Sequence, residues 1–218
     1  IGVILLLFTI GLEFSLKHLL KIRRIVFFGG FLQVTITAGL FYIMARLFHT
    51  DWKGGVFIGF LVALSSSALV LKLLQERSEL TSNFGRTVLG ILIFQDLLLV
   101  PLILFANLLV NPSADIESEL SILLLKTVFV IGLVYAGNRW LLPKLLHFIA
   151  LARNQELFNM SILLICFAIA LLTFKLGMSL AFGAFLAGLM ISESEYSHNA
   201  FGNLIPFKDT FTSFFFVS

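Results

Sequence analysis

One carboxylate, Asp96, stands near the middle of the apolar run 84–110. An aspartate at the centre of a membrane helix costs roughly 2.5–3.5 kcal/mol on insertion scales, and such a residue normally faces a protein interior or a water-filled cavity. Removal from water favours the protonated carboxyl, whereas a nearby cation favours the carboxylate. Asp96 could therefore hold either a proton or a metal ion. The alternative is a buried, protonated acid that only hydrogen-bonds to a neighbouring helix.

Two neighbours of this acid extend the possible chemistry. Gln95 offers one acceptor and two donors but carries no charge. Pro101 has no backbone N–H, and its ring clashes with the carbonyl of Leu97, four residues back. The proline therefore predicts a kink that frees an oxygen beside Asp96, and oxygen is the ligand that hard cations prefer. For a membrane proline taken by itself, a kink without a ligand role is the better-supported interpretation.

A run of three serines, Ser65, Ser66 and Ser67, falls midway along the apolar run 54–74. Serine hydroxyls compete for backbone hydrogen bonds and can bend or loosen a helix. One interpretation is an intact helix whose serines bond to the preceding turn. The other is a helix broken at membrane depth, which is tolerated where it lines a cavity and whose free ends can hold ions. The spacing of the residues alone favours neither of these two interpretations.

The composition requires a membrane environment for these residues. The chain is 59% hydrophobic and only 12% charged, whereas soluble domains carry about 25% charged residues. A net charge of +3 over 218 residues is too small and too scattered to indicate nucleic-acid binding. The single cysteine, Cys166, excludes a disulfide framework within the chain. No Cys/His cluster suggests a structural metal, and no cofactor is expected.

The apolar runs predict a helical bundle in the bilayer, because a spanning helix needs about 20 apolar residues. Runs of about this length lie at 25–48, 54–74, 84–110, 120–149 and 157–174, with a shorter one at 178–192 and partial ones at 1–14 and 207–218. The connections are short, so we expect one α-helical transmembrane domain over 1–218 and no extramembrane domain. The chain begins with Ile1 rather than Met, so we expect it to be part of a longer protein.

The positions of the basic residues predict the orientation of the chain in the membrane, and small residues predict where helices pack closely. Most of the 15 Lys and Arg residues fall on alternate connections, and short basic loops stay cytoplasmic. The basic loops 17–24, 75–83 and 144–156 are therefore expected on the cytoplasmic side. In "LAFGAFLAG", the small residues Gly183, Ala184 and Gly188 suit close packing between helices.

Several segments together carry a family resemblance. The stretches "ALSSSALVLKLLQERSEL", "GRTVLGILIFQDLLLVPLI" and "LGMSLAFGAFLAGLMISESEYSH" occur in this order. They resemble the Kef-type branch of the monovalent cation:proton antiporters, and the resemblance covers essentially the whole chain. It implies an all-α integral membrane protein with a sodium/proton antiporter-like inverted repeat, a discontinuous helix, a dimerisation domain and a moving core domain.

The resemblance also implies residue roles and partners. Asp96 would be the cation- and proton-binding carboxylate, Gln95 its neighbour, and "LSSSA" the unwound part of the first broken helix. The second broken helix is expected just after "SFFFVS". A homodimer in a bacterial or archaeal inner membrane is implied, and Kef-type proteins often carry a nucleotide-binding regulatory domain. No Gly-rich dinucleotide fingerprint occurs in this chain.

The leading hypothesis is a secondary transporter that exchanges K⁺ or Na⁺ for H⁺. One central carboxylate beside a neutral amide predicts one proton per monovalent cation and no net charge movement. A cation channel should show filter carbonyls or rings of like charge, and neither is evident. An aspartyl protease needs two membrane acids, and only Asp96 is central, so we expect no enzyme. A sensor or scaffold that lost transport stays open, because fold does not fix function.

Overall fold

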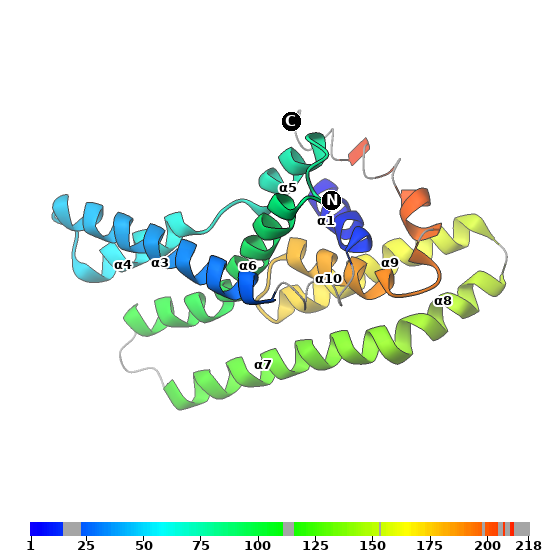
Figure 1. Cartoon of the computed structure of the whole chain (residues 1–218). Coiled ribbons are helices and arrows are strands. Elements are labelled where there is room, and N and C mark those ends of the chain that lie inside the picture. The colour runs from blue at the N-terminus through cyan, green and yellow to red at the C-terminus, as the bar shows by residue number, and fades with distance from the viewer. Residues whose placement is uncertain are drawn as a thin grey trace. The chain divides into compact units, whose positions relative to one another are not determined.

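The computed structural model describes residues 1–14, 23–110, 116–152, 154–197, 199–204, 207 and 210–211. Helices account for most of this part of the chain, and it contains no strand (Figure 1). The prediction of an all-α protein is therefore confirmed. Most of the basic loop 17–24 and most of the partial segment 207–218 lie outside the described residues, so the predictions made for them stay predictions.

The helices follow one another with short connections. They are α1 (Gly2–Glu13), α3 (Arg23–Leu47), α4 (Trp52–Ala63), α5 (Ser67–Glu76), α6 (Asn83–Val110), α7 (Ile116–Ala136), the π-helical turn η1 (Gly137–Leu141), α8 (Leu142–Leu151), α9 (Gln155–Lys175) and α10 (Leu180–Ser192). Within the described residues, five spans are long and apolar enough to cross a membrane: Val26–Leu47, Trp52–Glu76, Asn83–Ala106, Leu120–Leu151 and Gln155–Lys175. These spans confirm the five long apolar runs predicted from the sequence.

One predicted connection is shorter than expected. Lys144 lies inside α8, which continues from α7 through the π-helical turn, so helix runs on to Leu151. Only residues 152–154 separate α8 from α9. The loop given as 144–156 is therefore mostly helix. The apolar pattern of residues 142–151 outweighs their few charges.

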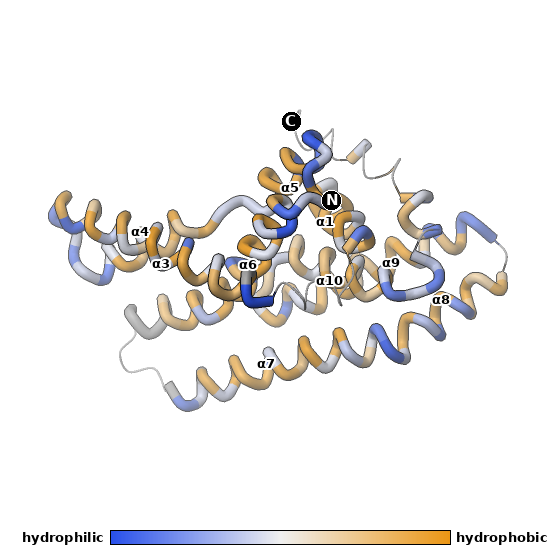
Figure 2. Tube along the Cα trace, viewed as in Figure 1, coloured by the Kyte–Doolittle hydropathy of each residue, from blue (hydrophilic) through white to orange (hydrophobic). Residues whose placement is uncertain are grey.

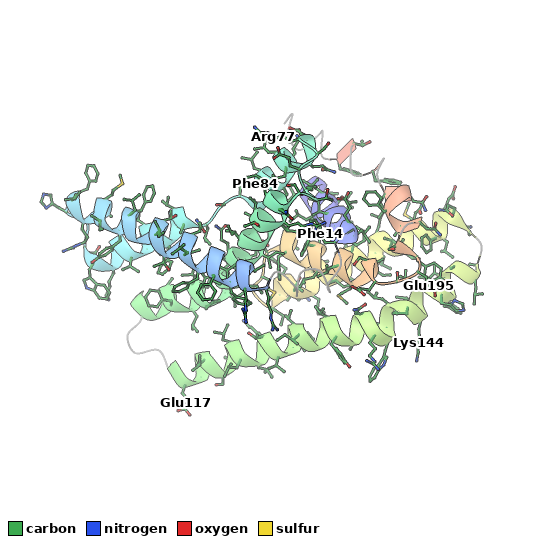
Figure 3. The ribbon with its side chains drawn as sticks, in the orientation of Figure 1. Phe14, Arg77, Phe84, Glu117, Lys144 and Glu195 are labelled. Carbon is green, nitrogen blue, oxygen red and sulfur yellow. The ribbon has the colours of Figure 1, made fainter. Side chains whose placement is uncertain are left out.

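Side-chain exposure in these helices is the reverse of that in a soluble protein. Phe28 is 78% exposed, and many other large apolar side chains lie outward along the helices. Figure 2 shows hydrophobic residues along most of the helical length and hydrophilic ones mainly at helix ends and connections. Figure 3 labels two charged residues at such places, Arg77 just past α5 and Glu117 at the start of α7. Continuous apolar surface of this kind requires lipid rather than water.

The chain forms two compact units, one made of Ile1–Leu20 and Leu125–Ser218, the other of Lys21–Leu124. In the first unit, α10 packs against both α1 and α9. Every residue of α10 from Phe182 to Ile191 is buried, so this helix forms the centre of the unit. The prediction of a single transmembrane domain over 1–218 stays a prediction.

Glycines allow α10 to approach both neighbours closely. A Cβ atom on Gly188 would overlap the backbone carbonyl oxygen of Phe8 in α1, and one on Gly183 would overlap the Thr173 hydroxyl in α9. Ala184 between them is fully buried. The reciprocal position in α1, Gly11, would overlap the carbonyl oxygen of Phe185 in the same way. The two helices therefore touch through their backbones, as small-residue motifs in membranes permit.

The second unit holds the acid-bearing helix. There α3 packs along α4 and along α6, and α5 also contacts α6. A Cβ on Gly59 would overlap the Ala38 carbonyl oxygen, so α3 and α4 approach closely. The α4 helix begins at a clear cap, because the Asp51 carboxylate accepts the Gly54 N–H at 3.3 Å. This packing brings α3, the α4–α5 junction and the middle of α6 together.

Candidate functional site

The apolar span Trp52–Glu76 is interrupted in its middle. The α4 helix ends at Ala63 and α5 begins at Ser67, while Leu64, with φ −80° and ψ 131°, is extended. Of the two interpretations left open for the serine run, the structure therefore has the broken helix. Ser65 and Ser66 lie in the break, but α5 begins at Ser67, so the prediction that "LSSSA" is unwound was wrong for its last two residues, Ser67 and Ala68.

The broken ends expose polar backbone groups. The last carbonyls of α4 and the first N–H groups of α5 have no partners within their own helices. The Ser66 hydroxyl caps α5 by accepting the Leu69 N–H at 3.4 Å. Helix ends carry partial charges, negative at the C-terminus and positive at the N-terminus. The break therefore places both signs of partial charge within one apolar span.

Gln95 of α6 contacts the α4 end and the middle of this break, and it is only 3% exposed. Its Oε1 accepts the Ser65 N–H at 2.9 Å. Its Nε2 lies 3.2 Å from the Ala63 carbonyl oxygen, to which it donates, and 3.5 Å from the Ser65 hydroxyl. The side chain thus satisfies backbone groups that the break leaves without helical partners.

Asp96, the next residue, is half-buried and contacts the other side of the break. Its Oδ2 accepts a hydrogen bond from the Ser67 hydroxyl at 3.2 Å. Ser67 stands at the N-terminal end of α5, where the helix dipole favours a negative charge. Among the residues that the structure describes, no Lys or Arg side chain pairs with Asp96. The Asp96 carboxylate therefore accepts a hydrogen bond from a hydroxyl that stands at a helix end.

Sequence reasoning missed one member of this cluster, Gln33 of α3. Its Oε1 accepts from Gln95 Nε2 at 2.7 Å. Its own Nε2 donates to the Ala63 carbonyl at 3.1 Å and lies 3.4 Å from the Thr37 hydroxyl. The signal was available, because Gln33 is an amide in the middle of the apolar run 25–48. Gln33 carries no charge, so it is not found by looking for charged residues within the apolar runs.

Pro101 lies within α6 without ending it, since the helix continues from Asn83 to Val110. The ribbon of α6 changes direction towards its C-terminal part (Figure 1), as expected where a proline removes one helical hydrogen bond. The predicted release of the Leu97 carbonyl as a ligand stays a prediction. Gly183, Ala184 and Gly188 lie in the first unit, in the α10 packing described above.

The chemical capacity of the cluster follows from its atoms. The Asp96 carboxylate and the Ser67 hydroxyl supply oxygen atoms, the ligands that hard cations prefer. The carboxylate can instead bind a proton, and the two ligands compete for the same charge. The amides of Gln33 and Gln95 add hydrogen bonds and no charge. The cluster therefore combines oxygen ligands with one ionisable group.

Comparison with known proteins adds independent findings. The family model described as "Sodium/hydrogen exchanger, transmembrane" matches residues 1–218. The "Glutathione-regulated potassium-efflux system protein KefC" of Escherichia coli O45:K1 (strain S88 / ExPEC) is 36% identical over 218 residues. The protein of the same name from Shigella sonnei (strain Ss046) is 35% identical. In both alignments the chain is covered completely but spans only 35% of the relative's length.

Proposed function

Because this chain belongs to the transmembrane sodium/hydrogen exchanger family, and because its helices require lipid, we propose that it is the membrane part of a secondary transporter that exchanges K⁺ or Na⁺ for H⁺. The observation that carries the proposal is the contact of Asp96 with Ser67 at the broken helix. Membership of an exchanger family also sets the enzyme interpretation aside.

In the proposed cycle, Asp96 alternately binds the two substrates. It releases its proton on one side of the membrane and takes up a cation, with oxygen atoms of the break completing the cation's shell. Movement of the helices that carry the site then exposes it to the other side, as in other transporters with discontinuous helices. With one carboxylate and the neutral Gln95 beside it, one proton is exchanged for one monovalent cation, so the cycle is electroneutral.

The relatives support a choice of the ion to test first, and the family resemblance supports a cellular location for the protein. Their printed names concern potassium efflux, so K⁺ is the first ion to test on this protein. From the family resemblance we also propose a bacterial or archaeal inner membrane, a homodimer, and a regulatory domain outside this chain. By the charge rule, the basic connection 77–82 and the connection 152–154 after α8 lie on the cytoplasmic side.

The direct test uses everted membrane vesicles that carry the full-length parent protein and hold a proton gradient. K⁺, Na⁺ and choline are added separately, and the collapse of the gradient is followed with a pH-sensitive dye. We expect one or both metal ions to collapse the gradient and choline to leave it intact. A gradient that no cation collapses would favour the transport-inactive sensor or scaffold. A large current at zero proton gradient would favour the cation channel.

Ser67→Ala is expected to raise the apparent KM for the cation about tenfold, because hydrogen bonds to charged groups contribute about 1.5–3 kcal/mol and part of this is regained from water. The Ser67 hydroxyl donates to Asp96, and in the proposed cycle the ionised form of Asp96 binds the cation. Cation-dependent proton flux in proteoliposomes measures the change. The matched control is Ser161→Ala, since that hydroxyl donates to Leu157 of its own helix. An unchanged KM in Ser67→Ala would exclude Ser67 from the site.

A further inference from the structure

Two glutamine side chains from different helices meet at the α4 end of the break. Gln95 Nε2 of α6 donates to Gln33 Oε1 of α3 at 2.7 Å, which is at the short end for an amide hydrogen bond. Both amides also donate to the same atom, the Ala63 carbonyl oxygen, at 3.1 Å from Gln33 and 3.2 Å from Gln95. Three chain segments that are distant in sequence are therefore joined at one point.

This pair satisfies the groups that the break exposes. A carbonyl oxygen accepts two hydrogen bonds, and the two glutamines supply both to Ala63. The Ser65 N–H, on the other side of Leu64, donates to Gln95 Oε1 at 2.9 Å. An unpaired backbone group away from water costs about as much as a lost hydrogen bond. The amide pair thus fixes the backbone immediately before and after Leu64.

The same hydrogen bonds determine which polar atoms near the break remain available to a substrate. Both N–H groups of Gln95 and one lone pair of its oxygen are used by Gln33, Ala63 and Ser65. Asp96 is the adjacent residue on the same helix, and its partner Ser67 begins the helix that follows the break. The spacing between Asp96 and Ser67 therefore depends on where the amide pair holds residues 63–65.

We infer that Gln33 is a positioning residue: it orients Gln95, and the Gln33–Gln95 amide pair holds the broken helix so that Ser67 meets Asp96. Its effect on transport rests on the proposed function, whereas its effect on the backbone does not. The pair is neutral and does not titrate, so it keeps the same geometry whether Asp96 binds a proton or a cation. A charged residue in either place would change its interaction at every turnover.

Hydrogen exchange of the backbone tests the inference without transport. In the full-length protein in detergent, Gln33→Leu should exchange the amides of residues 63–67 about tenfold faster, as expected when a buried hydrogen bond is lost. Gln33→Glu keeps an oxygen that accepts from Gln95, but it replaces the donor to the Ala63 carbonyl with a second acceptor. The backbone amides of residues 63–67 should therefore also exchange faster in this variant. The control is Thr35→Val, a polar side chain on the same helix that lies exposed. Native exchange rates in both Gln33 variants would overturn the inference.

Transport supplies the second readout. We expect the apparent KM for the cation to rise about tenfold in Gln33→Leu, with little change in the maximal rate, because positioning affects binding geometry. Since Gln33 acts through Ser67, the double variant Gln33→Leu/Ser67→Ala should be no worse than the more impaired single variant. Additive effects would contradict the positioning role. In a further outcome, the native protein transports no cation while the amides of residues 63–67 still exchange faster in Gln33→Leu. That result would contradict the proposed function but would support the amide pair as a structural element.

Discussion

Asp96→Asn is expected to abolish cation-dependent proton flux. Asparagine keeps the size of the side chain and an oxygen that accepts from Ser67, but it neither ionises nor takes up a proton. A carboxylate about 4 Å from a monovalent cation contributes about 4 kcal/mol at an effective dielectric constant of ~20, so cation affinity should fall roughly a thousandfold. The measurement is K⁺- and Na⁺-driven proton flux in proteoliposomes that contain equal amounts of native and variant full-length protein.

The matched control is Asp51→Asn in the same unit. Asp51 caps α4 through hydrogen bonds to Gly54 and is exposed, and asparagine caps helices about as well as aspartate. Its flux should equal that of the native protein. If Asp96→Asn and Asp51→Asn both transport at the native rate, Asp96 is a structural acid and the substrate binds elsewhere. If both fail, the loss reports folding rather than ion binding.

Gly188→Ala is expected to destabilise the first unit by about 2–3 kcal/mol, the upper part of the range for overpacking. Its Cβ would overlap the Phe8 carbonyl oxygen and would lie 3.0 Å from the Gly11 Cα. Backbone atoms cannot rotate away as the end of a side chain can, so α1 and α10 must separate. The measurement is the Tm of the full-length protein in detergent, which should fall by several degrees.

Gly132→Ala is the control for this substitution. Gly132 lies in α7, and a Cβ there would meet nothing within 4 Å. Alanine has the higher helix propensity, by about 1 kcal/mol, so the Tm should stay the same or rise. A Tm of Gly188→Ala equal to that of Gly132→Ala would mean that α1 and α10 do not pack through their backbones.

The broad features of the fold could be predicted because hydrophobic length alone determines them. The five spans match five apolar runs, since a bilayer imposes one minimum length on every helix. The apolar run was predicted to end at residue 149, two residues before the end of α8 at Leu151, and the predicted loop 144–156 overlaps α8 and the start of α9. Terminal residues of a helix contribute little to an apolar pattern, so boundaries are the weakest result of such an argument.

The candidate site was only partly predictable. Charge identified Asp96, because an ionisable group in a membrane is rare. The exact position of the break was not predictable, because three identical serines do not say which of them starts the next helix. In the structure Ser66 caps α5, and Ser67 is its first residue. Gln33 depends wholly on tertiary packing, since it reaches the site only where α3 lies against α6. A single sequence does not reveal that pairing of helices.

The reciprocal contact between Gly11 and Gly188 also limits how mutations in this protein can compensate for one another. In most packed interfaces, a residue that becomes too large can be offset by a smaller partner. Here each position already faces a glycine and the backbone of the opposite helix, so no smaller partner exists. A selection for second-site revertants of Gly188→Ala should therefore yield no change at residue 11. Revertants should arise among residues that set the separation or the tilt of α1 and α10.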